Sequence, residues 1–140
     1  MVNLITDRTQ ADVLLGNSKG RYDCSDLNRV ESAVKKLQAQ MEKLDIHLAL
    51  TVKTDWKFSD TFSQKNWPVK PQMERYLQNI RILADALHVQ PQLPKSMDHL
   101  DHLGANHIEQ TLMAVADRIQ GIRNTYKYSG ELYAGEENGI

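Results

Sequence analysis

Apolar residues recur at alternating steps of three and four in three separate stretches of this 140-residue chain. The longest stretch predicts a helix from about residue 26 to residue 44. Its apolar stripe consists of Leu27, Val30, Val34, Leu37, Met41 and Leu44. A mean step of about 3.5 residues is typical of helices that pack along one another at a shallow angle. Because a narrow stripe stabilises little by itself in water, these helices must bury their stripes against each other.

Two more stretches predict helices with the same spacing. One begins at Pro71, which suits the first turn of a helix, and ends near His88. Its stripe is formed by Met73, Tyr76 or Leu77, Ile80, Leu83 or Ala84, and Leu87. The other begins near residues 101–104, and its stripe is formed by Ile108, Leu112, Val115, Ile119 and Ile122. A short helix is expected within residues 6–15, between a Thr-Asp pair that can cap it and a Gly-Asn pair that can stop it.

The remaining segments have no helical periodicity. Residues 48–52 alternate loosely and contain β-branched side chains, which favours a short strand. Residues 54–71 are polar and carry four aromatic side chains, so we expect a long ordered loop that serves a contact. Residues 126–140 are rich in Tyr and Gly, which favours extended structure. The sequence therefore predicts a mainly α fold with a helical bundle domain over residues 1–125 and an extended C-terminal tail over residues 126–140. A minor two-stranded β element between residues 48–52 and the tail stays open.

Composition excludes several classes of protein. The 17 basic and 18 acidic residues give a net charge of −1, which is not the electrostatic footprint of a general nucleic-acid binder. No window approaches the roughly 18 to 20 apolar residues that a membrane span requires. Cys24 is the only cysteine, so the chain has no intrachain disulfide. We expect a protein that is made and folded in a cytoplasm and binds neither nucleic acid nor membrane.

Two four-residue segments nearly repeat each other, Asn28-Arg29-Val30-Glu31 and Asn106-His107-Ile108-Glu109. Their glutamates, with Glu74, could act as paired carboxylates. Each lies beside an apolar stripe, however, where hydrogen bonds to amides and pairing with Arg29 or Arg75 explain it more simply. We therefore predict no catalytic residue.

Metal-ligand types gather in one segment only, at Asp98, His99, Asp101, His102, His107 and Glu109. The histidines are spaced three and five residues apart, which does not place all three on one helical face, so solvated or capping side chains are favoured over a metal site. A metal-dependent enzyme stays an alternative, although we predict no metal or cofactor.

Aromatic side chains concentrate outside the predicted helices. Such residues either plug the ends of a bundle or anchor another protein, since Tyr and Trp dominate interface energetics. The candidate protein-contact residues are Trp56, Phe58, Phe62, Trp67, Tyr126, Tyr128 and Tyr133.

Several segments follow one another along most of the chain: Leu4-Ile5-Thr6-Asp7-Arg8-Thr9, Asp26-Leu27-Asn28-Arg29-Val30-Glu31, Val52-Lys53-Thr54-Asp55-Trp56, Met73-Glu74-Arg75-Tyr76-Leu77, Gly104-Ala105-Asn106-His107-Ile108-Glu109, and the closing Tyr-Ser-Gly-Glu and Tyr-Ala-Gly-Glu. In this order they resemble a family of short structural proteins from the tail and baseplate region of phages and prophages of Gram-positive bacteria. The resemblance implies a non-enzymatic virion component at the tail tip, baseplate or tail-fibre attachment.

The same resemblance implies partners among other phage tail or baseplate proteins, and several copies in a symmetric assembly. It carries over no catalytic residue. The alternative is a cytoplasmic assembly chaperone or regulatory binding module that uses the same surfaces and is absent from the mature particle.

Overall fold

The computed structural model describes residues 4–17, 19–20, 22, 24–56, 70–98 and 100–132, without the side chains of residues 24 and 126–132. Over these residues the chain forms four helices, α1 (Gln10–Leu15), α2 (Cys24–Lys43), α3 (Lys70–Ala86) and α4 (His102–Leu132), and no strand. The predicted mainly α fold, with three main helices and a short N-terminal one, is confirmed.

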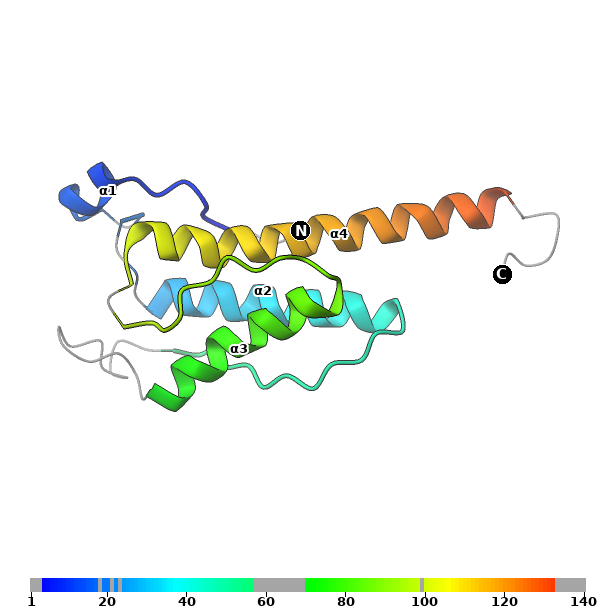
Figure 1. Ribbon diagram of the computed structural model, residues 1–140, viewed down its shortest axis with the longest axis horizontal. Coiled ribbons are helices and arrows are strands. Elements are labelled where there is room, and N and C mark those ends of the chain that lie inside the picture. Colours follow the sequence, from blue (N-terminus) through cyan, green and yellow to red (C-terminus); the bar gives the residue numbers. More distant parts are fainter. Residues whose placement is uncertain are drawn as a thin grey trace.

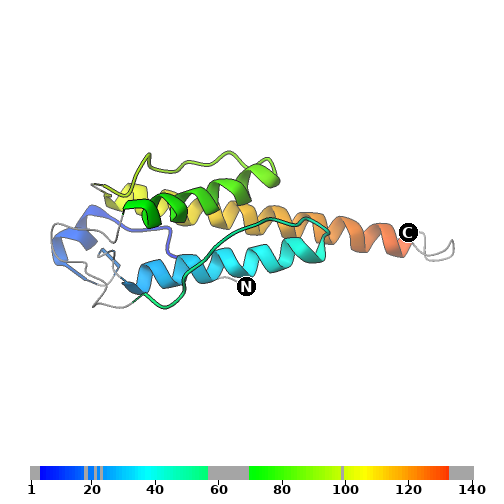
Figure 2. The same cartoon turned by 90° about the horizontal axis from the view of Figure 1, so that it is seen from below.

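The three long helices contact one another pairwise and all run in the same direction (Figure 1). Parallel helices need a return path between them, and extended chain supplies it because it advances about 3.3 Å per residue against 1.5 Å in a helix. We call these extended segments the first strap (residues 4–8), the second strap (residues 46–56) and the third strap (residues 88–98). The second and third straps run back along the bundle from the end of one helix toward the start of the next (Figures 1 and 2).

The same hydrogen-bond pattern ends α2 and α3 and starts the strap that follows each. Asp45 and His88 adopt left-handed φ values of 65° and 58°. After them, Ile46 N–H donates to the Met41 carbonyl and Val89 N–H donates to the Ala84 carbonyl, at 2.9 and 2.8 Å. Such six-to-one bonds close a Schellman motif and turn the chain out of the helix.

The apolar stripes face inward, as their spacing predicts. The α2 stripe from Leu27 to Met41 is at most 2% exposed, and the stripe residues of α3 and α4 lie in the same core. Leu44 and Ile122, at the ends of two stripes, are partly buried against it. The bundle therefore closes within one chain, a point that the spacing alone leaves open.

Two predictions for the irregular segments are wrong. Residues 48–52 form no strand; they belong to the second strap, whose polar backbone groups are bound by helix side chains. Residues 126–132 are not extended but continue α4, because adding residues to an existing helix costs little compared with starting one. Residues 57–69 of the expected aromatic loop and residues 133–140 of the expected tail lie outside the described residues.

A separate knob, of which residues 9–17, 19 and 20 are described, interrupts the path between the first strap and α2. It contains α1, which Thr9 and Asp12 cap reciprocally in a capping box and which Gly16 ends at φ 65°. Asn17 bridges the Asp12 carboxylate and the Gly20 N–H at 3.0 and 2.8 Å. A Cβ at Gly20 would lie 2.3 Å from the Asp12 carbonyl oxygen, so only glycine allows this close approach. The knob is therefore ordered by its own hydrogen bonds, although α1 buries no residue.

Candidate functional site

The repeated Asn-x-x-Glu segment on α4 holds the first strap. Asn106 Oδ1 accepts from the Arg8 N–H, and Asn106 Nδ2 donates to the Arg8 carbonyl, both at 2.9 Å. One turn along α4, Glu109 Oε1 accepts from the Ile5 N–H at 2.9 Å. The strap backbone is thus bound by side chains in place of a neighbouring strand. We call these two side chains the α4 clamp.

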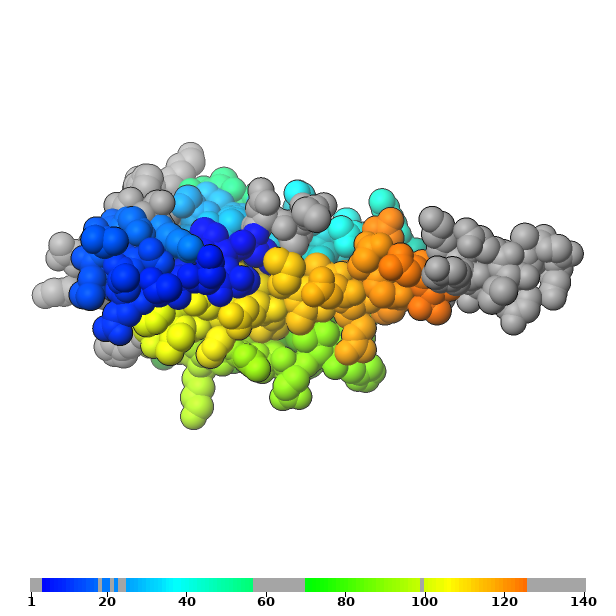
Figure 3. Space-filling model, turned by 90° about the horizontal axis from the view of Figure 1, so that it is seen from above, coloured from blue at the N-terminus to red at the C-terminus, as the bar shows by residue number. Residues whose placement is uncertain are grey.

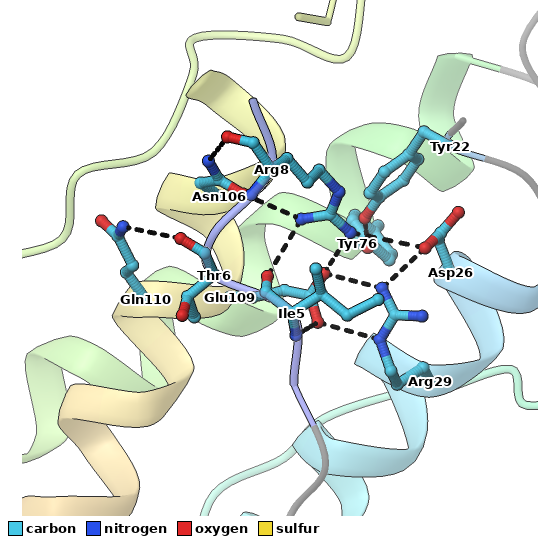
Figure 4. Close-up of polar contacts among 10 residues, drawn as sticks. All are labelled: Ile5, Thr6, Arg8, Tyr22, Asp26, Arg29, Tyr76, Asn106, Glu109 and Gln110. Atoms are coloured by element: carbon cyan, nitrogen blue, oxygen red, sulfur yellow. Dashed lines mark hydrogen bonds and ion pairs between the residues drawn. The ribbon is translucent and has the colours of Figure 1, made fainter. Parts of the chain in front are cut away.

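Charge fills the space between this clamp and α2 (Figure 4). Glu109, which is fully buried, pairs with Arg8 at 2.5 Å and with Arg29 at 2.7 Å. Asp26 pairs with the same two arginines, at 3.4 and 2.6 Å. Two arginines therefore meet two carboxylates in a site that only Arg29 leaves partly open to water, and each charge has at least two opposite partners.

The other Asn-x-x-Glu segment, on α2, holds the second strap in the same way. Asn28 Oδ1 accepts from the Trp56 N–H at 2.7 Å and Asn28 Nδ2 donates to the Trp56 carbonyl at 2.9 Å. Glu31 accepts from the Lys53 N–H at 3.0 Å and from the Trp56 indole N–H at 2.5 Å. Arg75 of α3 pairs with Glu31 at 2.8 Å. We call Asn28 and Glu31 the α2 clamp.

The two clamps follow one rule. In each, the asparagine binds both backbone groups of one strap residue, and the glutamate binds the N–H three residues earlier, the side chain of that strap residue and an arginine from another helix. The strap residues are Arg8 and Trp56, and a Thr-Asp pair precedes both. This shared Thr-Asp is the sequence signal for the straps, and the sequence analysis missed it.

The third strap is not held by an Asn-x-x-Glu clamp, because both the glutamate and the N–H that it would bind are missing. Arg75 occupies in α3 the place that Arg29 has in α2, and two residues later Leu77 stands where Glu31 would be. Three residues before buried Met97, the third strap has Pro94, which has no N–H to donate. The Pro94 carbonyl instead accepts from Arg81 at 3.4 Å.

Two tyrosines close the α4 clamp on the α3 side. The Arg8 guanidinium lies 5.6 Å from the centre of the Tyr22 ring, and the Tyr22 hydroxyl meets that of Tyr76. Part of Tyr22 stays accessible, whereas Tyr76 is 1% exposed. Burial, followed by the neighbouring hydroxyl, raises the pKa of Tyr76 well above 10; burial likewise raises the pKa of Tyr22.

Arg29, which pairs with Glu109 of the α4 clamp, stays charged. Burial lowers the pKa of Arg29, but the bonds and charges of Glu109 and Asp26 outweigh it, and the net shift is upward. Arg8 Nε is the one buried side-chain nitrogen or oxygen without a hydrogen bond over the described part of the chain. The α4 clamp, Arg8, Arg29 and Asp26 therefore form a structural network in which one buried donor, Arg8 Nε, has no acceptor.

The candidate chemical groups of the sequence have structural roles here. Glu31 and Glu109 accept from amides and pair with Arg75 and Arg29, as the sequence analysis favoured. Within the described ranges no three His, Cys, Asp or Glu side chains lie close enough to hold a metal. His99 lies outside those ranges, and Asp101 accepts from the Gly104 N–H at the start of α4.

The candidate contact residues divide into two groups. Trp56 is 4% exposed and packs in the core, which fits the plug role, one of the two roles expected for these aromatics. The side chains of Phe58, Phe62, Trp67, Tyr126, Tyr128 and Tyr133 lie outside the described residues.

An apolar patch on the knob was not among the predicted contacts. Leu14 and Leu15 are 80% and 76% exposed, and Val13 is 44% exposed. A cavity of about 640 Å³ separates the knob from the start of α4; Arg8, Val13, Tyr22, Leu100, His102 and Ala105 are among the residues that line it. The first strap and the knob form a continuous surface along α4 (Figure 3).

Comparison with known protein families, curated sequences and solved structures finds no match to this chain. Among the helices of the described residues, none is long and apolar enough to cross a membrane.

Proposed function

We propose that this protein is a non-enzymatic structural component of a phage virion, an adaptor at the tail tip, baseplate or tail-fibre attachment. The observation that carries the proposal is the knob. Hydrogen bonds within the knob hold α1 in place, while Leu14 and Leu15 are exposed to solvent. An ordered element that buries nothing of its own and exposes leucines is typical of a surface that another protein covers.

The resemblance to phage tail proteins supports the same role. Four of the segments that carry it are the two clamps and the strap residues that they hold. Those segments build a scaffold in which the side chains of the two clamps bind the backbone of the straps.

The shape of the molecule also supports an adaptor. The C-terminal part of α4 projects past the ends of α2 and α3 (Figures 1 and 2). Arg123, Asn124 and Thr125, in the C-terminal half of α4, are exposed. The knob and the projection thus lie toward opposite ends of the bundle and offer two separate surfaces to neighbours.

Mass spectrometry of purified phage particles tests the proposal. A virion component is present in stoichiometric amounts after gradient purification, whereas an assembly chaperone is found in the lysate and absent from particles. Absence from particles would overturn the proposal in favour of the chaperone.

A variant pair then tests the contact surface. Leu14→Ser with Leu15→Ser is expected to leave the fold intact, since both side chains are exposed, and to lower incorporation into particles. Met113→Ser, which changes an exposed apolar residue of α4 away from the knob, is the matched control and should incorporate normally. Equal incorporation of both variants would remove the knob from the contact surface.

A further inference from the structure

The connection between the first strap and α2 is much longer than the structure needs. Arg8 and Tyr22 are in contact, with the guanidinium 5.6 Å from the ring centre, yet the thirteen residues 9–21, most of them in the knob, separate them in sequence. Thirteen residues can span more than about 40 Å when extended, which exceeds the width of a three-helix bundle. The connection between the first strap and α2 is therefore longer than the distance that it has to bridge.

Few contacts of the described residues hold the knob against the bundle. None of the α1 residues is buried, and the 640 Å³ cavity lies between the knob and α4. Among the described residues, the ion pair between the knob and the first strap joins Lys19 to Asp7 at 2.9 Å; it is exposed and contributes little. Displacing the knob would therefore take no α1 side chain out of the core.

The first strap, by contrast, is bound by groups that do not depend on the connection. Asn106 and Glu109, 98 to 104 residues away in sequence, supply its backbone contacts. Asp26 and Glu109 provide negative charge for Arg8. Any chain that presents the same four residues, Ile5 to Arg8, satisfies the α4 clamp equally well.

We propose that the α4 clamp is an exchangeable docking site, and that the first strap of a second copy of this chain occupies it when copies are concentrated. Exchange keeps every contact between strap and clamp, so the two arrangements differ only in the path of the knob and in the entropy of association. A tethered strap competes at an effective concentration of about 1 mM, so the closed form prevails in dilute solution and exchange appears near that concentration. The proposal rests on the geometry of the clamp and does not require the phage role.

The second strap provides the matched control. It follows the Schellman motif at the end of α2 directly, with no intervening slack, and Arg75 and Asn79 of α3 also bind its Thr51 carbonyl at 2.6 and 2.7 Å. Leaving the α2 clamp would require unwinding that end of α2. We therefore expect the first strap to exchange and the second not to.

Disulfide trapping between different chains tests this difference. In a Cys24→Ser background, Thr6→Cys on one chain is mixed with Gln110→Cys on another, because the Gln110 amide donates to the Thr6 carbonyl at 3.3 Å. The equivalent positions at the α2 clamp are Thr54 and Ser32, and T54C is mixed with S32C in parallel. Each mixture is oxidised at protein concentrations from about 0.01 to 1 mM, which bracket the effective concentration of the tether.

Only the first pair is expected to give a species at twice the 16.0 kDa chain mass, in an amount that rises with concentration. Equal yields from the two pairs would overturn the proposal. The T6C/Q110C double variant at low concentration should close within one chain, which shows that the cysteines can meet.

If the double variant does not close, isotope-filtered NMR on unmodified protein decides. Labelled and unlabelled chains are refolded together at about 1 mM, the concentration at which exchange competes. Contacts between Ile5 or Arg8 of one chain and Asn106 of another support exchange, and their absence overturns it.

Discussion

The two clamps bind backbone in the same way and differ in what they place at their centres. At the α2 clamp, Trp56 donates its indole N–H to Glu31, and Arg75 is the cation that pairs with that carboxylate among the described residues. At the α4 clamp, Arg8 takes the place of Trp56, and a second carboxylate and a second arginine accompany it. Backbone recognition is therefore independent of the residue that fills the pocket, which is aromatic in one clamp and ionic in the other.

The largest expected effect on stability comes from removing the charge of Glu109 in the α4 clamp. Glu109→Gln leaves Arg8 and Arg29 with only Asp26 between them, so we expect the free energy of unfolding to fall by about 3–5 kcal/mol. Urea denaturation measures it. Glu74→Gln, at an exposed position of α3, is the control and should change stability by less than about 0.5 kcal/mol. A loss at Glu109 no larger than the control would mean that the ionic network contributes nothing.

Loss of either asparagine should cost about the same. Asn28→Ala and Asn106→Ala each leave one strap N–H and one carbonyl without a partner, which predicts about 2–3 kcal/mol for each variant. The free energies of unfolding of the two variants are compared through their urea midpoints, with one common dependence on urea concentration. A difference of more than about 1.4 kcal/mol, or tenfold in the folding equilibrium, would show that the clamps do not share one rule.

A smaller effect is expected at the aromatic centre. Trp56→Phe keeps most of the buried ring and removes the N–H, while Glu31 retains Arg75 and the Lys53 N–H. We expect a loss of about 1–2 kcal/mol by the same measurement. A loss as large as that of Glu109→Gln would mean that the Trp56 N–H contributes as much to stability as the ion pairs of Glu109.

The smallest expected effect on stability is the one at alkaline pH. Because the folded state raises the pKa of Tyr76, the unfolded chain loses this proton first, and stability falls as the pH rises above about 10. Tyr76→Phe removes this term and should reduce the loss between pH 9 and pH 11 by about 1.4 kcal/mol. The readout is the change in unfolding free energy with pH. An identical decline in both proteins would exclude Tyr76 as a contributor.

The sequence predicts the helices well and their polar connections poorly. The stripe from Leu27 to Met41 identifies α2 because a buried helix face depends on local spacing. The repeated Asn-x-x-Glu is visible in the sequence, but its ligands lie about 25 or about 100 residues away and depend on how three helices meet.

The same limit explains the errors. Residues 48–52 have the composition of a strand, yet side chains of α2 and α3 satisfy their carbonyl groups and no second strand is needed. Arg8 lies in a polar segment near the start of the chain, and nothing local indicates that it is 96% buried. Trp56 has no helical periodicity around it, and its burial follows from Glu31 and Asn28, which only the fold brings near.

The parallel course of α2, α3 and α4 has an electrostatic consequence. In an antiparallel bundle the helix macrodipoles largely cancel, but here all three point the same way, so partial positive charge collects where the helices begin and partial negative charge where they end. Each molecule is thus an oriented dipole in spite of a net charge of only −1. Copies stacked head to tail would attract through these ends, whereas copies placed head to head would repel.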